Sequence, residues 1–498
     1  MVDAPIHQFL WELTLPAVRA GWSAGQALID DGKPVSRVAV PEYEQSNAGW
    51  PMVVATSSVF IPKTAPVKWR SMFSTTPSQF GDLVVVGDVP ELSAALEAVR
   101  ARSQDDQTFA RGMNAFADQG GDALRNGSLE WEYLSFVGSI VGRAVATDAT
   151  SDEDLLNVYL QLERGRFAPE LSGDLVAPLT MTDLGIEESV ELGGGVTIEA
   201  LTPDMQRARA LDSHAAEGVS PYLVAAATHA VVVKAITISN LPYANRILAT
   251  SVTPIIPASD VDKIDRAIQC IHIVIEKDTG YNQLFVRPDG WADGWNHDLP
   301  PIWKIEAMPN YPQSLYRAPW QTVAREPAGA EQVNEIAAAY RALDTAPNDV
   351  KLAARRSVGA MMRTNDEDRT LDATIGVEAL LLSDNAELKH RMALRAAAAL
   401  FDEYRPEAIY ELARKVYDHR SEIAHGSVKS KPTFKYDGDE LVSAEIAPFL
   451  LRALLRSRLA SKNPWTKDDL EKRLLTGLDH YRASLTDTVG QAAPPQHT

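Results

Sequence analysis

The sequence predicts an α+β multidomain protein, in which a mixed, sheet-containing N-terminal region precedes an all-α helical bundle. Before residue 310, short runs rich in Val, Ile and Thr are typical of strands. After residue 330, apolar residues recur at helical spacing. We expect four segments: an N-terminal α/β sensor or regulatory region divided near 120–220 (1–310), a proline- and aromatic-rich linker (311–330), a helical domain (331–490) and a frayed tail (491–498).

Composition places the chain among ordinary globular proteins. Its 498 residues are 45% hydrophobic and 23% charged, with a net charge of −19. That acidity argues against a protein that coats nucleic acid non-specifically. The window 348–431 holds 14 Lys/Arg and 14 Asp/Glu, so it is neutral and the rest of the chain carries the excess negative charge.

Several elements are expected in the N-terminal region. The runs at 52–61 and 82–87 resemble buried strands, and residues 90–102 have the apolar spacing of a helix. Residues 154–163 form an acidic, helix-like stretch. Valine-rich segments on both sides of Gly193-Gly-Gly predict a hairpin, because a phosphate-binding loop would lead from a strand into a helix.

Residues 221–310 are expected to be sheet-rich, with strands over 223–238, 246–256 and 267–275. Cys270 and His272 would then share one side of a strand. A metal site would need two more ligands, and no Cys-x-x-Cys or His-Glu-x-x-His motif supplies them. We expect no metal and no other cofactor. Six aromatic residues crowd 291–320, where they either pin the linker to its neighbours or form a platform for stacking bases or a partner protein.

The expected location is the cytoplasm. Cys270 is the only cysteine, and the chain starts without the basic and apolar segments of a signal peptide. The longest apolar run, 222–238, is interrupted by His229 and Lys234 and predicts a core element, so no membrane partner is expected.

The C-terminal domain is expected to consist of helices near 331–344, 348–364, 367–383, 385–403, 406–426, 444–460 and 466–485. The fifth helix ends in Tyr417-Asp-His-Arg-Ser-Glu-Ile-Ala-His425-Gly426. Gly426 suits the position after a helix end, so His425 would lie in the last turn, where the helix dipole favours a protonated imidazole. Arg420 offers a planar fork that matches phosphate. Histidine suits proton transfer, and an arginine beside it could stabilise a crowded phosphorane.

The spacing of Arg420 and His425 is weak evidence by itself. Five residues of helix separate their Cα atoms by about 7.5 Å along the axis and roughly 140° around it. His419 neighbours Arg420 but points about 100° away. An arginine followed by a histidine at similar spacing also occurs at Arg209/His214, Arg266/His272, Arg414/His419 and Arg473/His480.

Three segments in order carry a more specific signal. The Tyr417 stretch resembles the Tyr-x-x-Arg-Ser-x-Ile-x-His-Gly signature of the Apea-like HEPN domains. Upstream, Arg369-Thr-Leu-Asp-Ala-Thr-Ile-Gly-Val-Glu-Ala-Leu-Leu-Leu resembles that family's Asp-x-x-Ile-x-Leu-Glu-x-Leu-Leu helix, with Val377 replacing the usual leucine. Leu388-Lys-His-Arg-Met-Ala-Leu-Arg-Ala-Ala resembles its Leu-Arg-x-Ala helix. The resemblance covers about residues 350–430.

The resemblance implies a helical bundle, a two-fold homodimer and RNA cleavage without metal. It assigns catalysis to Arg420 and His425. Supporting roles fall to Tyr417, Ser421 and two carboxylates on the helix near the cleft, Asp372 and Glu378, either of which could orient the catalytic pair or be a solvated charge. Arg395 and Arg414 are candidate RNA-phosphate contacts, with surface salt bridges as the alternative.

The leading functional hypothesis is an endoribonuclease of an antiviral-defence, abortive-infection or toxin-like system. Its N-terminal region would sense a phage-derived or cellular trigger, or restrain the nuclease. The alternative is a non-catalytic HEPN module for dimerisation and RNA binding, attached to a ligand- or protein-binding domain. A third hypothesis, in which the N-terminal region is itself an enzyme, finds no known triad, metal-site or nucleotide-binding motif.

Overall fold

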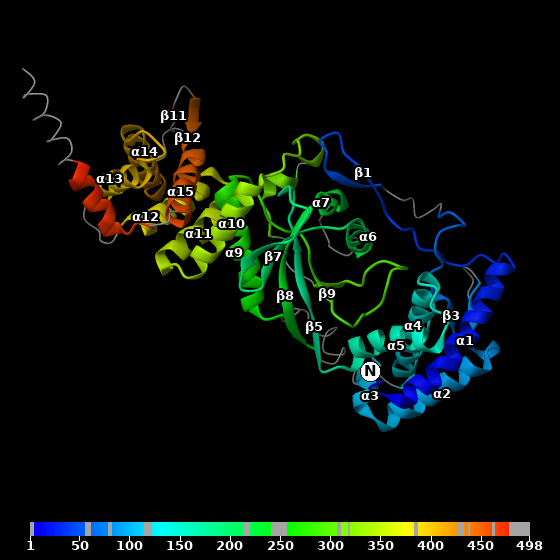
Figure 1. Ribbon diagram of the computed structural model, residues 1–498. Helices are drawn as coiled ribbons and strands as arrows, with labels where there is room; N and C mark the ends of the chain where they lie inside the picture. Colours follow the sequence, from blue (N-terminus) through cyan, green and yellow to red (C-terminus); the bar gives the residue numbers. More distant parts are fainter. Residues whose placement is uncertain are drawn as a thin grey trace, which may run out of the picture.

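The chain folds into three successive parts, seen in a computed structural model (Figure 1). N-terminal helices lie at one end, a six-stranded sheet occupies the middle, and the C-terminal helices lie at the other end. The protein is therefore a mixed α+β structure, as the sequence predicts. The structure describes residues 4–54, 61–77, 82–113, 122–212, 220–240, 256–305, 310–316, 319–382, 387–426, 433–436, 439–460 and 464–477.

The first part is a helical cluster with its own apolar core. It contains helices α1 (Gln8–Asp30), α2 (Pro90–Asp105), α3 (Gln107–Gly112), α4 (Asp122–Ala146) and α5 (Asp152–Phe167). Two short parallel strands, β3 (Phe73–Ser74) and β4 (Val84–Val85), and the 3₁₀ turns η1 (Trp69–Ser71) and η2 (Val86–Asp88) pack beside them. The expected helices at 90–102 and 154–163 are confirmed as α2 and α5, whereas the expected strand at 82–87 shrinks to β4.

The central sheet is antiparallel, in the order β10-β9-β5-β8-β7-β6. Its strands are β5 (Glu170–Pro178), β6 (Val190–Gly193), β7 (Val196–Ala200), β8 (His229–Ser239), β9 (Leu284–Pro288) and β10 (Trp303–Ile305). The expected hairpin is confirmed by the pairing of β6 with β7. Gly193, Gly194 and Gly195 all have positive φ, the conformation for which a turn between strands favours glycine.

The two faces of the sheet are covered differently. One face packs into the largest core, and the other carries Val176, Val232 and Phe285 against Met205 of α6 (Pro203–Asp212). Beside that second face lies a charge cluster in which Asp174 and Glu199 each pair with both Lys234 and Arg287. Two acids and two bases neutralise one another there, so the cluster presents no net charge to a ligand.

The expected strand at 267–275 is wrong, because these residues belong to helix α9 (Ala258–Ile275). Their β-branched composition suggested a strand, but the buried residues recur at helical spacing: Ile264, Ala267, Ile268, Ile271 and Val274. Cys270 and His272 therefore do not share a strand face, and both are buried in the core. Within the expected strand 223–238, the short helix α7 (Pro221–Ala225) comes first, and β8 begins only at His229. The expected strand at 246–256 lies almost wholly outside the described residues.

Three of the six crowded aromatic residues are structural. Trp291, Tyr311 and Trp320 are each no more than 6% exposed; Trp291 belongs to the largest core, and Tyr311 and Trp320 share a smaller one. Trp291 Nε1 donates to the Ser172 carbonyl at 2.6 Å. Buried rings cannot stack on bases, so these three residues attach the segment to its neighbours and do not form a stacking platform. The 3₁₀ turns η4 (Gln313–Tyr316) and η5 (Pro319–Gln321) lie here, near the hairpin of β1 (Glu42–Gln45) and β2 (Pro51–Val54).

The expected C-terminal helices are present. They are α10 (Ala330–Asp344), α11 (Asn348–Met362), α12 (Asp366–Leu381), α13 (Leu388–Leu400), α14 (Pro406–Ala424), α15 (Ser443–Ala460) and a helical stretch over 467–477. An unexpected hairpin, β11 (Thr433–Tyr436) with β12 (Asp439–Val442), separates α14 from α15, so this part is not purely helical. The expected tail at 491–498 lies outside the described residues.

One continuous core joins the sheet to the C-terminal helices. The largest cluster of buried apolar residues includes strand residues, most of the inner face of α9, and residues from α10 to α15. Helix α9 packs against α10, α11 and α15, and α10 also packs against β6. The C-terminal helices are therefore built directly onto the sheet through α9 and α10.

Candidate functional site

Helix α14 carries the predicted catalytic pair and is fixed by its neighbours on one side. Pro406 lies in its first turn, where its missing N–H costs nothing. Its buried residues Ile409, Leu412, Ala413 and Val416 face the core shared with α12, α13 and α15. The helix ends at Ala424, and Gly426 follows with a φ of +64°. His425 is therefore the C-terminal capping residue, close to the expected last turn.

Arg420 lies on the inner edge of α14, facing α12. Its Nε lies 3.4 Å from Glu378 Oε1, in an ion pair that lacks the alignment of a hydrogen bond. The Arg420 side chain remains 33% exposed, although its Nε is buried. Burial raises the pKa of the Glu378 carboxyl, and the positive charge of Arg420 offsets part of that rise. Of the two candidate carboxylates on α12, Glu378 is the one that contacts Arg420.

His425 is exposed, and in one copy of the chain it does not face Arg420. With 100° per residue, the two positions differ by about 140° around α14. Ser421 is half-buried and lies between them, about 40° from His425. A single copy therefore presents an arginine toward α12 and a histidine toward solvent.

Asp372 has a structural role in this fold. Its carboxylate is almost fully buried and pairs with Arg356 of α11 and with Arg363, whose Nε lies 2.7 Å from Oδ2. Both arginines contact the same carboxylate, so Asp372 ties the end of α11 to α12. These contacts argue against the predicted role of Asp372 in orienting Arg420 or His425.

The two arginines considered for phosphate contacts lie in different environments. Arg395 is 3% exposed, donates to the Leu381 carbonyl and pairs with Glu471. Its guanidinium is therefore not available to a phosphate, and it joins α13 to the last helical stretch. Arg414 is 40% exposed, pairs with the exposed Glu411 at 3.2 Å and lies over the Tyr410 ring. Arg414 is the one of the two that solvent, and hence RNA, can reach.

His419 belongs to the buried residues of α14 and lies at the border with the exposed side of the helix. Its ring is 7% exposed, and its Nδ1 has no hydrogen-bond partner among the described residues. Burial lowers the pKa of His419, while Glu422 and Glu367 raise it in part. A neutral, buried imidazole packed toward the core does not suit proton transfer at the surface that carries His425.

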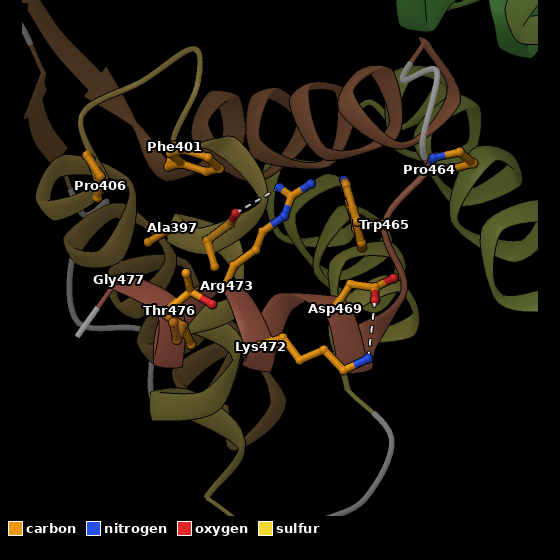
Figure 2. A pocket seen from close by; sticks show the side chains of 12 residues that line it. Ala397, Phe401, Pro406, Pro464, Trp465, Asp469, Lys472, Arg473, Thr476 and Gly477 are labelled. Carbon is orange, nitrogen blue, oxygen red and sulfur yellow. Dashed lines mark hydrogen bonds and ion pairs between the residues drawn. The ribbon is translucent and has the colours of Figure 1, made fainter. Parts of the chain in front are cut away.

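Two of the hollows in the described part of the C-terminal helices lie next to α13 and α14. The larger one, of about 770 Å³, lies between the end of α13 and residues 464–477 and is walled mainly by apolar groups (Figure 2). Arg473 crosses it to donate to the Ala398 carbonyl at 3.3 Å and lies over the Phe401 ring. Lys472 points toward Asp469, 3.9 Å away. The cations of this hollow are thus already engaged within the protein.

The second hollow, of about 710 Å³, lies beside α14 on the same side as Ser421. It is lined by Glu387, Leu388, Lys389, His390, Tyr410, Arg414 and Tyr417. Sequence reasoning identified Arg414 and Tyr417 but missed Lys389, His390 and Tyr410. The available signal was the spacing of Tyr410, Arg414 and Tyr417, which places one cation between two aromatic rings on one helix face.

Among the described residues, no three His, Cys, Asp or Glu side chains gather closely enough to hold a metal ion. No helix in the described part of the chain combines the length and apolar character needed to cross a membrane. No protein-family model, curated protein or solved structure matches the chain in comparisons with known proteins.

Proposed function

We propose that the protein is a metal-independent endoribonuclease whose chemistry takes place at the C-terminal end of α14. The observation that carries the proposal is the pair of accessible groups there. Arg420 pairs with Glu378 from a second helix while its side chain stays partly exposed. His425 is exposed at the helix end. A positioned cation and a titratable imidazole are two of the groups that RNA cleavage without metal requires.

The proposed reaction is an attack of the ribose 2′-oxygen on the adjacent phosphorus. A base accepts the 2′-hydroxyl proton, and the new P–O bond forms as the P–O5′ bond breaks. An acid protonates the departing 5′-oxygen, which leaves a cyclic phosphate and a free 5′-hydroxyl. His425 is assigned to proton transfer, and Arg420 to the negative charge on the phosphorane.

One copy of the chain supplies only part of this set, since Arg420 and His425 diverge by about 140° around the helix. The proposal therefore includes a two-fold homodimer in which two α14 helices face each other and complete a composite site. The resemblance to HEPN domains supports this arrangement, as does the exposure of His425 on the side of α14 away from the core. The antiviral or toxin-like role rests on the resemblance alone, and cytoplasmic action is proposed from the single cysteine.

The N-terminal region is proposed to control the nuclease. The shared core supports this part, because α9 packs between the sheet and helices α10, α11 and α15. If a trigger binds and rearranges the sheet, the packing of those helices would change as well.

The test is cleavage of a tRNA and mRNA pool in EDTA by the full-length protein. We expect wild type to cut, His425→Ala to be inactive, and Arg420→Gln to be slowed by at least a hundredfold. Glu422→Gln, an exposed residue in the same turn as His425, serves as a matched control and should cut normally. An oligonucleotide with a single 2′-deoxyribose at the cut position should resist cleavage.

Equal cleavage by wild type and His425→Ala would refute the assignment of the site. Loss of wild-type activity in EDTA, with recovery on adding a divalent metal, would refute the metal-independent mechanism. RNA binding without any cleavage would favour the non-catalytic alternative, a module for dimerisation and RNA binding.

A further inference from the structure

The hollow beside α14 is built by cross-helix contacts. The imidazole Nδ1 of His390, at the start of α13, lies 3.0 Å from the Tyr410 hydroxyl, and the two rings meet edge to face. Lys389 Nζ lies 2.6 Å from Asp418 Oδ2 of α14. These contacts fix the spacing of α13 and α14, so the hollow of about 710 Å³ keeps its shape.

The lining groups combine aromatic surface with two cations, Lys389 and Arg414, and one carboxylate, Glu387. Tyr410 and Tyr417 are half-buried, so part of each ring packs against the core and part remains accessible. Arg414 lies between them in sequence and over the Tyr410 ring, 5.6 Å from its centre. Proteins that bind single strands use this combination, in which bases stack on aromatic rings and a cation meets the backbone.

The acidic partners of the two cations do not block an anion. Glu411 and Asp418 are 52% and 54% exposed, and ion pairs at that exposure are weak. The Arg414 guanidinium contacts Glu411 through one nitrogen only. A phosphate could engage the remaining N–H groups of Arg414 in the stronger two-point geometry.

The hollow lies on the route to His425. Counted at 100° per residue, Tyr410, Arg414, Tyr417, Ser421 and His425 fall within an arc of about 80° on α14. From Tyr417 to His425 the helix advances about 12 Å, a span of a few nucleotides. A strand seated in the hollow could therefore follow this face of α14 to the proposed catalytic end.

We propose that this hollow is a subsite for single-stranded RNA, holding a nucleotide a few positions from the cut. Its base stacks on Tyr410 or Tyr417, and its phosphate binds Arg414. The inference rests on the proposed function for its substrate class, and it adds which face of α14 the strand follows and which residues hold it.

The experiment measures binding of a fluorescent 12-nucleotide RNA to the full-length His425→Ala protein, which leaves the RNA uncut, across a series of salt concentrations. In the His425→Ala protein, the second substitution Arg414→Gln should weaken RNA binding about tenfold. It should also reduce the slope of log affinity against log salt concentration by about 0.7, the value for one phosphate contact. Tyr410→Leu should weaken binding about tenfold without changing the slope.

Two variants serve as controls. Lys415→Gln removes the same charge as Arg414→Gln from the next residue of α14, which is exposed and points about 100° away, and should leave both affinity and slope unchanged. Tyr410→Phe keeps the ring and loses only the contact with His390, so it should bind nearly as well as the parent. Thermal unfolding of each variant separates lost binding from lost folding.

The outcomes of binding and cleavage are distinguishable. If wild type cuts RNA but Arg414→Gln and Tyr410→Leu bind as tightly as Lys415→Gln, the subsite is refuted and the nuclease stands. If wild type does not cut but both variants weaken binding, the nuclease fails and the subsite stands as an RNA-binding surface. A full-length protein that binds no RNA refutes both.

Discussion

Glu378→Gln tests whether the ion pair between α12 and α14 exists for activity or for stability. The substitution keeps the size and polarity of the side chain but removes its charge. Arg420 then loses the carboxylate that lies 3.4 Å from its Nε, while its guanidinium stays charged and accessible. If the pair positions Arg420 for a phosphate, cleavage should suffer more than folding.

The structure allows the stability effect to be estimated. Two unit charges 3.4 Å apart attract by about 1.2 kcal/mol in water and about 5 kcal/mol at an effective dielectric of ~20. Because a third of the Arg420 side chain is exposed, solvent screens the pair, and its contribution to stability is close to the value in water, about 1 kcal/mol. Burial of Glu378 outweighs it, since the pKa of this carboxyl is raised above its ordinary 4.5.

The sign follows from that raised pKa. An acid whose pKa is higher in the folded state stabilises the fold below its ordinary pKa, and this contribution is lost as pH rises through the folded value. At pH 7 the Glu378 carboxylate is thus a net cost. We expect Glu378→Gln to be as stable as wild type or more stable, by up to about 1 kcal/mol, with the difference disappearing in acid.

Urea unfolding and steady-state RNA cleavage together form the assay. We expect kcat to fall about tenfold, the equivalent of about 1.4 kcal/mol, because Arg420 is no longer held, while KM stays close to wild type. Glu378→Asp should recover part of kcat, and Glu403→Gln, an exposed carboxylate just before α14, should change neither quantity. A variant that cuts at the wild-type rate, or that loses several kcal/mol of stability, contradicts the positioning role.

Two further predictions concern the fold that supports the site. Gly376→Ala should destabilise the protein by about 1–3 kcal/mol, because a Cβ there would lie 2.6 Å from Leu451 Cδ2 of α15. Gly359→Ala on α11 should stabilise it by up to about 1 kcal/mol, because the nearest atom to the new Cβ would be 3.6 Å away. The urea midpoints of the two variants test this, and equal shifts would contradict the packing argument. His272 has its pKa lowered to about 4 by burial and by the nearby Arg452, so wild-type stability should decline as pH falls from about 6.5 to about 4, by at most about 3 kcal/mol. His272→Gln should show a flatter pH profile over that range, and an unchanged profile would refute the assignment.

The helices of the C-terminal part could be predicted because their signals are local. Pro406 and Gly426 bracket α14, and Asn365 begins α12 by accepting from two backbone N–H groups. The β11–β12 hairpin also has a local signal, because Asp437-Gly438 stands in the sequence between the two strands, but the prediction of an all-helical part did not use it. Within α9, the composition of β-branched residues and the helical periodicity disagreed, and the periodicity determined the structure.

The candidate site could be predicted only in part, because residue types are local and their partners are not. The motif locates Arg420 and His425, but nothing in the sequence separates the roles of Asp372 and Glu378, six residues apart on one helix. That distinction depends on where Arg356 and Arg363 come to lie. Likewise, Arg395 and Arg414 look equivalent in sequence, yet one is buried under the last helical stretch and the other faces a hollow.

The shared core also limits how the proposed regulation can operate. A nuclease domain tethered by a flexible linker could be released as a separate body. Here α9 lies against α10, α11 and α15, and the apolar residues of the sheet and of the C-terminal helices form one cluster. Separating the two parts would expose a large apolar surface, at roughly 25 cal/mol for each Å². If the N-terminal region controls RNA cleavage, the signal must therefore pass through packed helices, and α15, which contacts α9, α12 and α14, is the most direct path to Arg420.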